Sequence, residues 1–209
     1  MLSNLLLLPE RLVNEMVKTD ILISGVGGQG TILTGRIIAA LAMSEGMDVK
    51  TAETHGMAQR GGSVITHVRI GEKVFSPLIP VGDGDVLLSF EKLEALRWLP
   101  YLSPKGTVIV NTQELEPLPV LTGEAEYSGG ILEEIEGKVG RLIAAEALSI
   151  DPVNKNPRMV NTFLLGILAQ TMEYDKEKWF RVMEQQIKAK LVDINKQAFE
   201  AGWKFAQNS

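Results

Sequence analysis

The segment Gly25–Gly30 (GVGGQG) places four glycines between a short apolar run and a stretch with helical spacing. The run Asp20–Ser24 predicts a buried strand, and the apolar residues from Ile32 to Ala42 recur as on one face of a helix. Glycines at such a turn let bare backbone N–H groups approach a ligand at the positive end of a helix dipole. The segment therefore predicts an α/β domain with an anionic guest, such as a phosphate, a pyrophosphate or a carboxylate. The alternative is that the glycines only pack the helix against the strand.

The rest of the chain continues this alternation of strands and helices. Further strands are expected over residues 48–52, 63–70, 85–90 and 106–111, with a hairpin from the second of these into 74–76. Helices are expected from Glu91 to about Pro100 and over 131–148, 159–173, 175–192 and 194–206, with 112–130 as a loop. This order predicts an α/β fold: a three-layer Rossmann-like domain with a mostly parallel sheet and a helical C-terminal part.

A single domain is expected over residues 17–207, because no internal repeat, low-complexity tract or linker interrupts the chain. Residues 1–16 are expected to form an N-terminal extension or tail, and Met16 is a candidate for the true start. The apolar run Leu5–Leu8 ends at Pro9 and is too short for a secretory signal or a membrane span. A soluble, cytoplasmic protein is therefore expected.

Composition excludes several kinds of chemistry. The chain has no cysteine, so it forms no disulfide and binds no zinc or iron–sulfur cluster through thiolates. Its two histidines, His55 and His67, make a multi-histidine metal site improbable. With 21 basic and 26 acidic residues, the net charge of −5 argues against nucleic acid as a partner.

A second polar, glycine-rich segment follows the strand predicted over 48–52. The segment 53–63 (ETHGMAQRGGS) is expected at the carboxyl edge of the sheet, where open α/β folds bind ligands. Arg60 beside Gly61 and Gly62 offers a guanidinium next to open backbone, which suits a carboxylate or a phosphate. His55 is a weak candidate for a proton donor, and the alternative for the whole segment is a solvated loop. His67, inside a predicted strand, is expected to be structural.

The nucleotide interpretation of the glycine segment requires an acidic residue about 20 residues later, at the end of the second strand. Glu53 lies 23 residues past Gly30, and a glycine-rich loop follows it. This spacing leaves an NAD cofactor open as an alternative. Asn161, Asn195 and Gly202 are interpreted as helix caps and packing positions, and Gly166 as a site of close helix packing.

Taken together, these segments resemble the gamma-type subunit of 2-oxoacid:ferredoxin oxidoreductases. The matching residues are Gly25–Gly30, Thr54–Ser63 (THGMAQRGGS), Asn161 with Leu165 and Gly166, and Asn195 through Ala198 and Phe199 to Gly202. The resemblance covers roughly residues 17–205. The 54–63 segment is the specific part, and it favours the beta subunit of the indolepyruvate branch.

The resemblance implies a heteromeric enzyme of anaerobic metabolism that decarboxylates an aryl 2-oxoacid, reduces ferredoxin and releases an acyl-CoA. Thiamine diphosphate and the iron–sulfur clusters are expected on a larger alpha subunit, with coenzyme A as co-substrate. The chain is expected to complete the active-site and coenzyme A region and to be inactive alone; a homodimer in isolation is an open alternative. No catalytic residue is assigned beyond the weak candidate His55. Expected contacts to ligand, cofactor or partner are Gly25, Gly27, Gly28, Gln29, Gly30, His55, Gly56, Met57, Gln59, Arg60, Gly61 and Gly62.

Two other functions remain open at this stage. One is a stand-alone NAD-dependent dehydrogenase, which depends on the glycine segment and Glu53. The other is a non-catalytic module that binds a nucleotide or coenzyme A.

Overall fold

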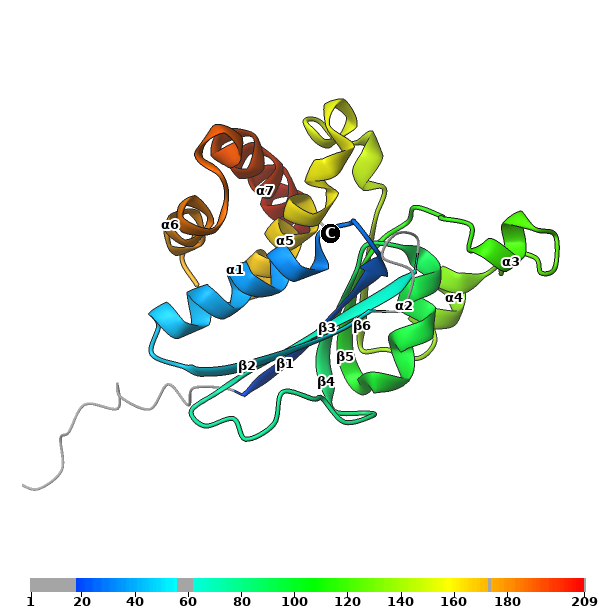
Figure 1. Ribbon diagram of the computed structural model, residues 1–209, viewed down its shortest axis with the longest axis horizontal. Coiled ribbons are helices and arrows are strands. Elements are labelled where there is room, and N and C mark those ends of the chain that lie inside the picture. Colours follow the sequence, from blue (N-terminus) through cyan, green and yellow to red (C-terminus); the bar gives the residue numbers. More distant parts are fainter. Residues whose placement is uncertain (1–17, 56–61, 173, 209) are drawn as a thin grey trace, which may run out of the picture.

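The computed structural model describes residues 18–55, 62–172 and 174–208, and its strands form one six-stranded sheet in the order β2-β3-β1-β4-β5-β6 (Figure 1). β1, β4, β5 and β6 run parallel, whereas β3 lies antiparallel between β1 and β2. The strands are β1 (Thr19–Val26), β2 (Asp48–His55), β3 (Ser63–Gly71), β4 (Gly84–Ser89), β5 (Leu102–Asn111) and β6 (Arg141–Ala145).

Helices cover both faces of this sheet. α1, α5, α6 and α7 lie on one face, and α2 and α4 lie on the other (Figure 1). The helices are α1 (Thr31–Ser44), α2 (Lys92–Trp98), α3 (Leu118–Leu121), α4 (Ile131–Glu136), α5 (Val160–Thr171), α6 (Lys176–Gln186) and α7 (Val192–Gln207). Short 3₁₀ turns lie at Leu99–Tyr101, Ala147–Ser149, Val153–Lys155, Pro157–Met159 and Ala189–Leu191.

The alternation of side chains along β1 divides the interior into two cores. Ile21 and Ile23 point into the core beneath α1, α5, α6 and α7, while Leu22 points into the core beneath α2 and α4. The predicted three-layer α/β fold with a mostly parallel sheet and a helical C-terminal part is confirmed.

Several predictions of secondary structure were wrong. The helix predicted over 131–148 ends at Glu136, and residues 141–145 instead form β6, which pairs with β5. Residues 74–76 form no strand, and the predicted loop 112–130 contains the short helix α3. The apolar run at 142–145 is compatible with either a helix or a strand. Its pairing with β5 at the edge of the sheet makes it a strand.

The antiparallel insertion of β3 follows from a short connection. The chain passes from His55 to Ser63 in fewer than the dozen or so residues that a parallel crossover needs. β3 therefore returns beside β2 and takes the place next to β1 that the second strand of a dinucleotide-binding fold would occupy.

The prediction of close helix packing at Gly166 and Gly202 is confirmed where α5 crosses α7. A Cβ on Gly166 would lie 2.1 Å from the Phe199 carbonyl oxygen, and one on Gly202 would lie 1.8 Å from the Phe163 carbonyl oxygen. Asn161 and Asn195 lie inside the first turns of these helices, whose N-caps are Met159 and Leu191, so the cap interpretation of the two asparagines was wrong.

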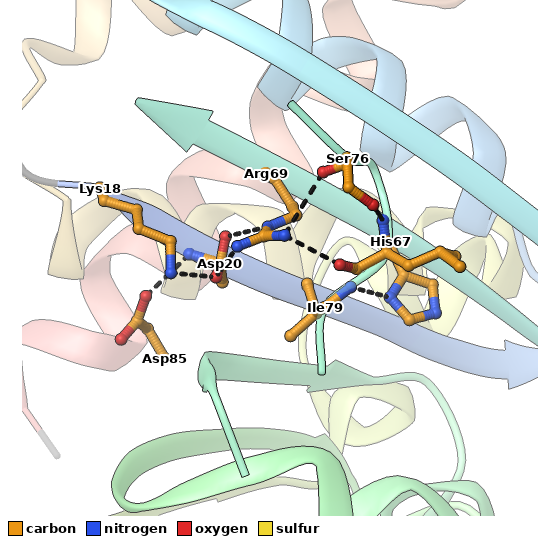
Figure 2. A network of polar contacts seen from close by, with 8 residues as sticks. Lys18, Asp20, His67, Arg69, Ser76, Ile79 and Asp85 are labelled. Atoms are coloured by element: carbon orange, nitrogen blue, oxygen red, sulfur yellow. Dashed lines mark hydrogen bonds and ion pairs between the residues drawn. The ribbon is translucent and has the colours of Figure 1, made fainter. Parts of the chain in front are cut away.

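A buried ion pair connects β1 to β3 and to the segment that follows β3 (Figure 2). Asp20 is fully buried, and its two carboxylate oxygens accept from Arg69 Nε at 2.8 Å and Nη2 at 3.1 Å. Arg69 Nη1 donates to the carbonyl oxygens of Ser76 at 3.4 Å and Leu78 at 2.9 Å. The pair therefore fixes the segment between β3 and β4 against the sheet.

His67 has the structural role that its strand position predicts. Its buried ring accepts a hydrogen bond at Nδ1 from the Ile79 backbone N–H at 3.2 Å (Figure 2). The rings of Trp98 and Tyr101 meet it edge-on. Burial, with a smaller contribution from the Arg69 guanidinium, holds the pKa of His67 below its usual range.

The expected N-terminal extension over residues 1–16 lies outside the described residues. Among the helices that the structure describes, none is long and apolar enough to cross a membrane.

Candidate functional site

The glycine segment lies at the carboxyl end of β1, next to the start of β3. Gly25 pairs with Val64 across the sheet, and Val64 pairs with His55 at the end of β2. The Gly27 N–H donates to the Gly62 carbonyl oxygen at 2.9 Å. The structure thus brings the two predicted segments to the same edge of the sheet.

Gln29 folds back and holds the turn in place. Its Oε1 accepts from the Val26 N–H at 2.7 Å, and its Nε2 donates to the Phe90 carbonyl oxygen at 3.2 Å. A Cβ on Gly25 would lie 2.8 Å from that Oε1, so the folded-back side chain requires glycine there. The oxygen and the nitrogen of the Gln29 amide both form hydrogen bonds within the fold, so this side chain stabilises the conformation of the loop.

The N-terminus of α1 is left open for a ligand. Its N-cap residue is Gly30, with φ of 92°, and the helix has neither a side-chain cap nor an acidic residue in its first turn. The first N–H groups of a helix have no carbonyl partner inside it, and they carry the positive end of its dipole. These donors are therefore free to bind an anion.

Asn161, from the start of α5, packs directly against this N-terminus. Its side-chain Nδ2 lies 2.6 Å from the position that a Cβ on Gly30 would take, so glycine is required by this contact as well as by its positive φ. Asn161 is only 6% exposed. Among the described residues, Nδ2 has no hydrogen-bond acceptor, while Oδ1 accepts weakly from Thr162 Oγ1 at 3.4 Å. A side-chain amide donor thus lies beside the helix N-terminus and in the lining of a cavity.

A cavity of about 380 Å³, here called the anion cavity, opens at this place. Its volume falls in the range of small-molecule sites. Arg158 brings a guanidinium from the turn before α5, and Gln113 brings an amide from the segment that follows β5. The lining residues are Gly28, Gln29, Gly30, Gln113, Leu115, Leu148, Pro157, Arg158, Val160 and Asn161. Backbone donors, the amides of Gln113 and Asn161, and one guanidinium around an apolar wall suit a phosphate or carboxylate carried on an organic group.

A larger cleft of about 740 Å³, here called the acidic cleft, lies on the other side of the glycine segment. Val26, Gly62 and Ser63 contribute to it from the sheet edge, and Leu115 lines both the cleft and the anion cavity. At its base, the buried Glu91 carboxylate accepts from the Tyr127 hydroxyl and from the Glu94 N–H at 2.8 Å. Burial is the main cause that raises the pKa of Tyr127, and the hydrogen bond from its hydroxyl to Glu91 raises it further.

The predicted site residues divide as follows. Gly28, Gln29 and Gly30 line the anion cavity, and Gly62 lines the acidic cleft. Gly25 and Gly27 shape the turn, and the His55 backbone ends β2. Gly56, Met57, Gln59, Arg60 and Gly61, and the His55 side chain, lie outside what the structure describes.

Sequence reasoning missed Arg158 and Gln113, and it did not place Asn161 beside Gly30. No local signal marks them, because tertiary packing alone brings three distant segments together. In the part of the chain that the structure describes, no group of three His, Asp or Glu side chains is arranged to hold a metal ion. With no cysteine in the sequence either, the described residues do not fit an iron–sulfur cluster.

Known proteins share this fold over nearly the whole chain. A protein named indolepyruvate oxidoreductase subunit IorB, from Archaeoglobus fulgidus, is 39% identical over 191 residues, covering 90% of this chain and 94% of its own. The keto/oxoacid ferredoxin oxidoreductase gamma subunit from Geobacter sulfurreducens has a TM-score of 0.66 at 21% identity, covering 91% of this chain and 99% of that one.

A 2-oxoglutarate:ferredoxin oxidoreductase from Magnetococcus marinus, solved with 2-oxoglutarate, coenzyme A and succinyl-CoA bound, has a TM-score of 0.70 at 21% identity. That likeness covers 92% of this chain but 31% of the other, so the same fold also occurs as part of a longer chain. Residues 20–205 match the family described as pyruvate ferredoxin/flavodoxin oxidoreductase. The chain belongs to this family.

Proposed function

We propose that this chain is the cluster-free subunit of an indolepyruvate-type 2-oxoacid:ferredoxin oxidoreductase. The observation that carries the proposal is the 39% identity to an indolepyruvate oxidoreductase subunit of nearly the same length. In this function a larger partner subunit holds thiamine diphosphate and the iron–sulfur clusters. The complex converts an aryl 2-oxoacid and coenzyme A into an acyl-CoA and carbon dioxide, and ferredoxin takes up the electrons. The cytoplasm is the expected location.

The contribution of this chain is to position a substrate, with no bond made by its own side chains. The α1 N-terminus, the Asn161 amide and the Arg158 guanidinium together hold an anionic group of coenzyme A or of the 2-oxoacid in the anion cavity. Donors that are already fixed in the fold cost little reorganisation when the ligand binds. The apolar residues Leu115 and Leu148 exclude water from the rest of the bound group.

The sheet order argues against a stand-alone NAD enzyme. An acidic residue that binds the ribose must end the strand next to β1, but Glu53 lies on β2, with β3 in between. Strands are spaced about 4.8 Å apart, so Glu53 is two strand spacings away from the glycine segment. This geometry supports the subunit function over the dehydrogenase.

The proposal is tested by purifying the tagged chain from its native source and recording a visible spectrum and a ferredoxin-reduction assay. We expect a brown complex with a cluster-bearing thiamine enzyme that reduces ferredoxin with indolepyruvate and coenzyme A. Recovery of a colourless chain alone, binding NAD in a titration, would instead favour the dehydrogenase. Binding of coenzyme A by a chain that never joins a thiamine enzyme would favour the non-catalytic module.

A further inference from the structure

One wall of the acidic cleft is formed by α3 and carries exposed apolar side chains. Leu121 lines the cleft from α3 and is 66% exposed, while Leu118 on the same short helix is 71% exposed and does not line the cleft. None of the residues in α3 is buried, so the helix packs against little of its own domain. Exposed apolar groups rimmed by polar residues mark binding surfaces.

This wall is nevertheless firmly attached to the domain. The buried Glu91 carboxylate accepts from the Leu115 N–H at 3.2 Å on one side and from the Tyr127 hydroxyl on the other. One carboxylate at the start of α2 thus ties down both ends of the segment that carries α3. An apolar surface held in place before binding loses little entropy when a partner covers it.

The charges around the cleft are mainly negative. Four glutamates line it, against the single cation Arg97 among the described lining residues. Arg97 already pairs with Glu94, and Glu114 already pairs with Lys92. Glu116, exposed at the rim, has no ion-pair partner among the described residues. A partner that complements this surface brings a cation next to apolar side chains.

We infer that a segment of the larger subunit, carrying a lysine or arginine flanked by apolar side chains, binds in the acidic cleft. The cation pairs with Glu116, and the apolar side chains cover Leu121. This inference depends on the proposed function, which supplies the larger subunit. The related fold that forms 31% of a longer chain is a precedent for such a domain beside further protein. Because Leu115 and the glycine segment separate the cleft from the anion cavity, the bound segment would lie directly beside the proposed substrate site.

The test compares variants of the full chain for affinity to the purified larger subunit, at low and at high salt. Glu116→Lys reverses the charge at the rim, and Leu121→Ala removes the apolar contact. Matched controls are Glu124→Lys and Leu118→Ala, which also change exposed residues but ones that do not line the cleft. We expect each cleft variant to weaken assembly by roughly tenfold, and both controls to stay within about twofold. The loss in Glu116→Lys should shrink at high salt, whereas the loss in Leu121→Ala should not.

Equal affinity of the cleft variants and the controls, in a complex that still reduces ferredoxin, would overturn this inference and leave the proposed function intact. Failure of the unmodified chain to assemble with any thiamine subunit would overturn both. If the cleft variants instead abolish a homodimer and leave the heteromer unchanged, the occupant is a second copy and the inference is wrong. Circular dichroism and thermal unfolding of every variant exclude misfolding as the cause.

Discussion

Asp20 and Arg69 face each other as direct partners in the antiparallel register of β1 and β3, and their side chains form a two-bond ion pair. Asp20 is fully buried, and Arg69 is 14% exposed at its side chain. Lys18 Nζ also lies 2.8 Å from Asp20 Oδ2, but the Lys18 side chain is 58% exposed, so Arg69 supplies the buried contacts. A buried charge that loses such contacts costs much more than an exposed one, because water cannot replace them. The pair also holds the segment after β3 through the Ser76 and Leu78 carbonyl groups.

Replacing Arg69 with alanine should therefore lower the free energy of unfolding by about 3 kcal/mol, as expected for breaking a buried pair. Lys50→Ala is the matched control, because its pair with Asp48 is exposed and should be worth less than about 1 kcal/mol. Urea unfolding of both variants measures the difference. An equal decrease in the free energy of unfolding in both variants would show that the buried Asp20–Arg69 pair stabilises the fold no more than the exposed pair does.

Stability should fall as the pH decreases below about 6.5, the ordinary pKa of histidine. The folded pKa of His67 is lowered, so the unfolded chain binds a proton that the folded chain resists. The stabilisation is complete above the unfolded pKa and is lost as the pH falls toward the folded one. A protonated ring also cannot accept the Ile79 N–H.

Denaturant unfolding between about pH 7.5 and 5.5 tests this slope. His67→Gln should flatten it, and the unmodified chain under the same conditions is the control. The comparison stays in this range because burial raises the pKa of Asp85, which gives the opposite slope at lower pH. A slope that survives in His67→Gln would contradict the assignment.

Gly166→Ala and Gly202→Ala should each destabilise the protein by at least about 1–3 kcal/mol, as overpacking does. The added methyl group would meet the backbone of the facing helix, which cannot move aside as a side chain can. Gly129→Ala is the control, since nothing lies within 4 Å of its would-be Cβ. Thermal unfolding ranks the stabilities of the three variants. If Gly202→Ala were as stable as the unmodified chain, α5 and α7 would be able to move apart and accommodate the methyl group.

Arg158→Ala should raise the KM for coenzyme A or for the 2-oxoacid by roughly tenfold, the typical cost of a lost charge-assisted contact. Arg181→Ala removes an exposed arginine outside the anion cavity and should leave both KM values unchanged. Steady-state kinetics of the assembled complex with each substrate varied in turn identifies which anion the cavity holds. Unchanged KM values for both substrates would remove Arg158 from the proposed site.

Asn161→Leu keeps the approximate volume but removes the amide that lies beside Gly30. We expect a smaller rise in the same KM value, about threefold to tenfold, because one neutral donor is lost and the helix N-terminus remains. Asn195→Leu is not a suitable control, since Asn195 bonds to Thr162 and Leu191 inside the fold. Gln113→Leu, in the lining of the same cavity, tests whether both amides contribute.

The sequence by itself determined the elements whose signals are local. The apolar run at 20–24, the glycines at 25–30 and the helical spacing after them predicted β1, its turn and α1, because strand, turn and helix preferences act between near neighbours. The absence of cysteine likewise excludes thiolate ligation of a metal or a cluster, because no arrangement of the chain can supply a ligand that it lacks.

Only the tertiary structure decided which distant segments meet. β3 lies between β1 and β2, and residues 141–145 form β6, because these strands pair with their neighbours. The sequence of a single segment does not indicate which strand it will pair with. Likewise, Asn161 and Arg158 come beside Gly30 because α5 packs on the face of the sheet that α1 covers. Strand pairing and side-chain packing join residues that are far apart in the chain, so the anion cavity became visible only in three dimensions.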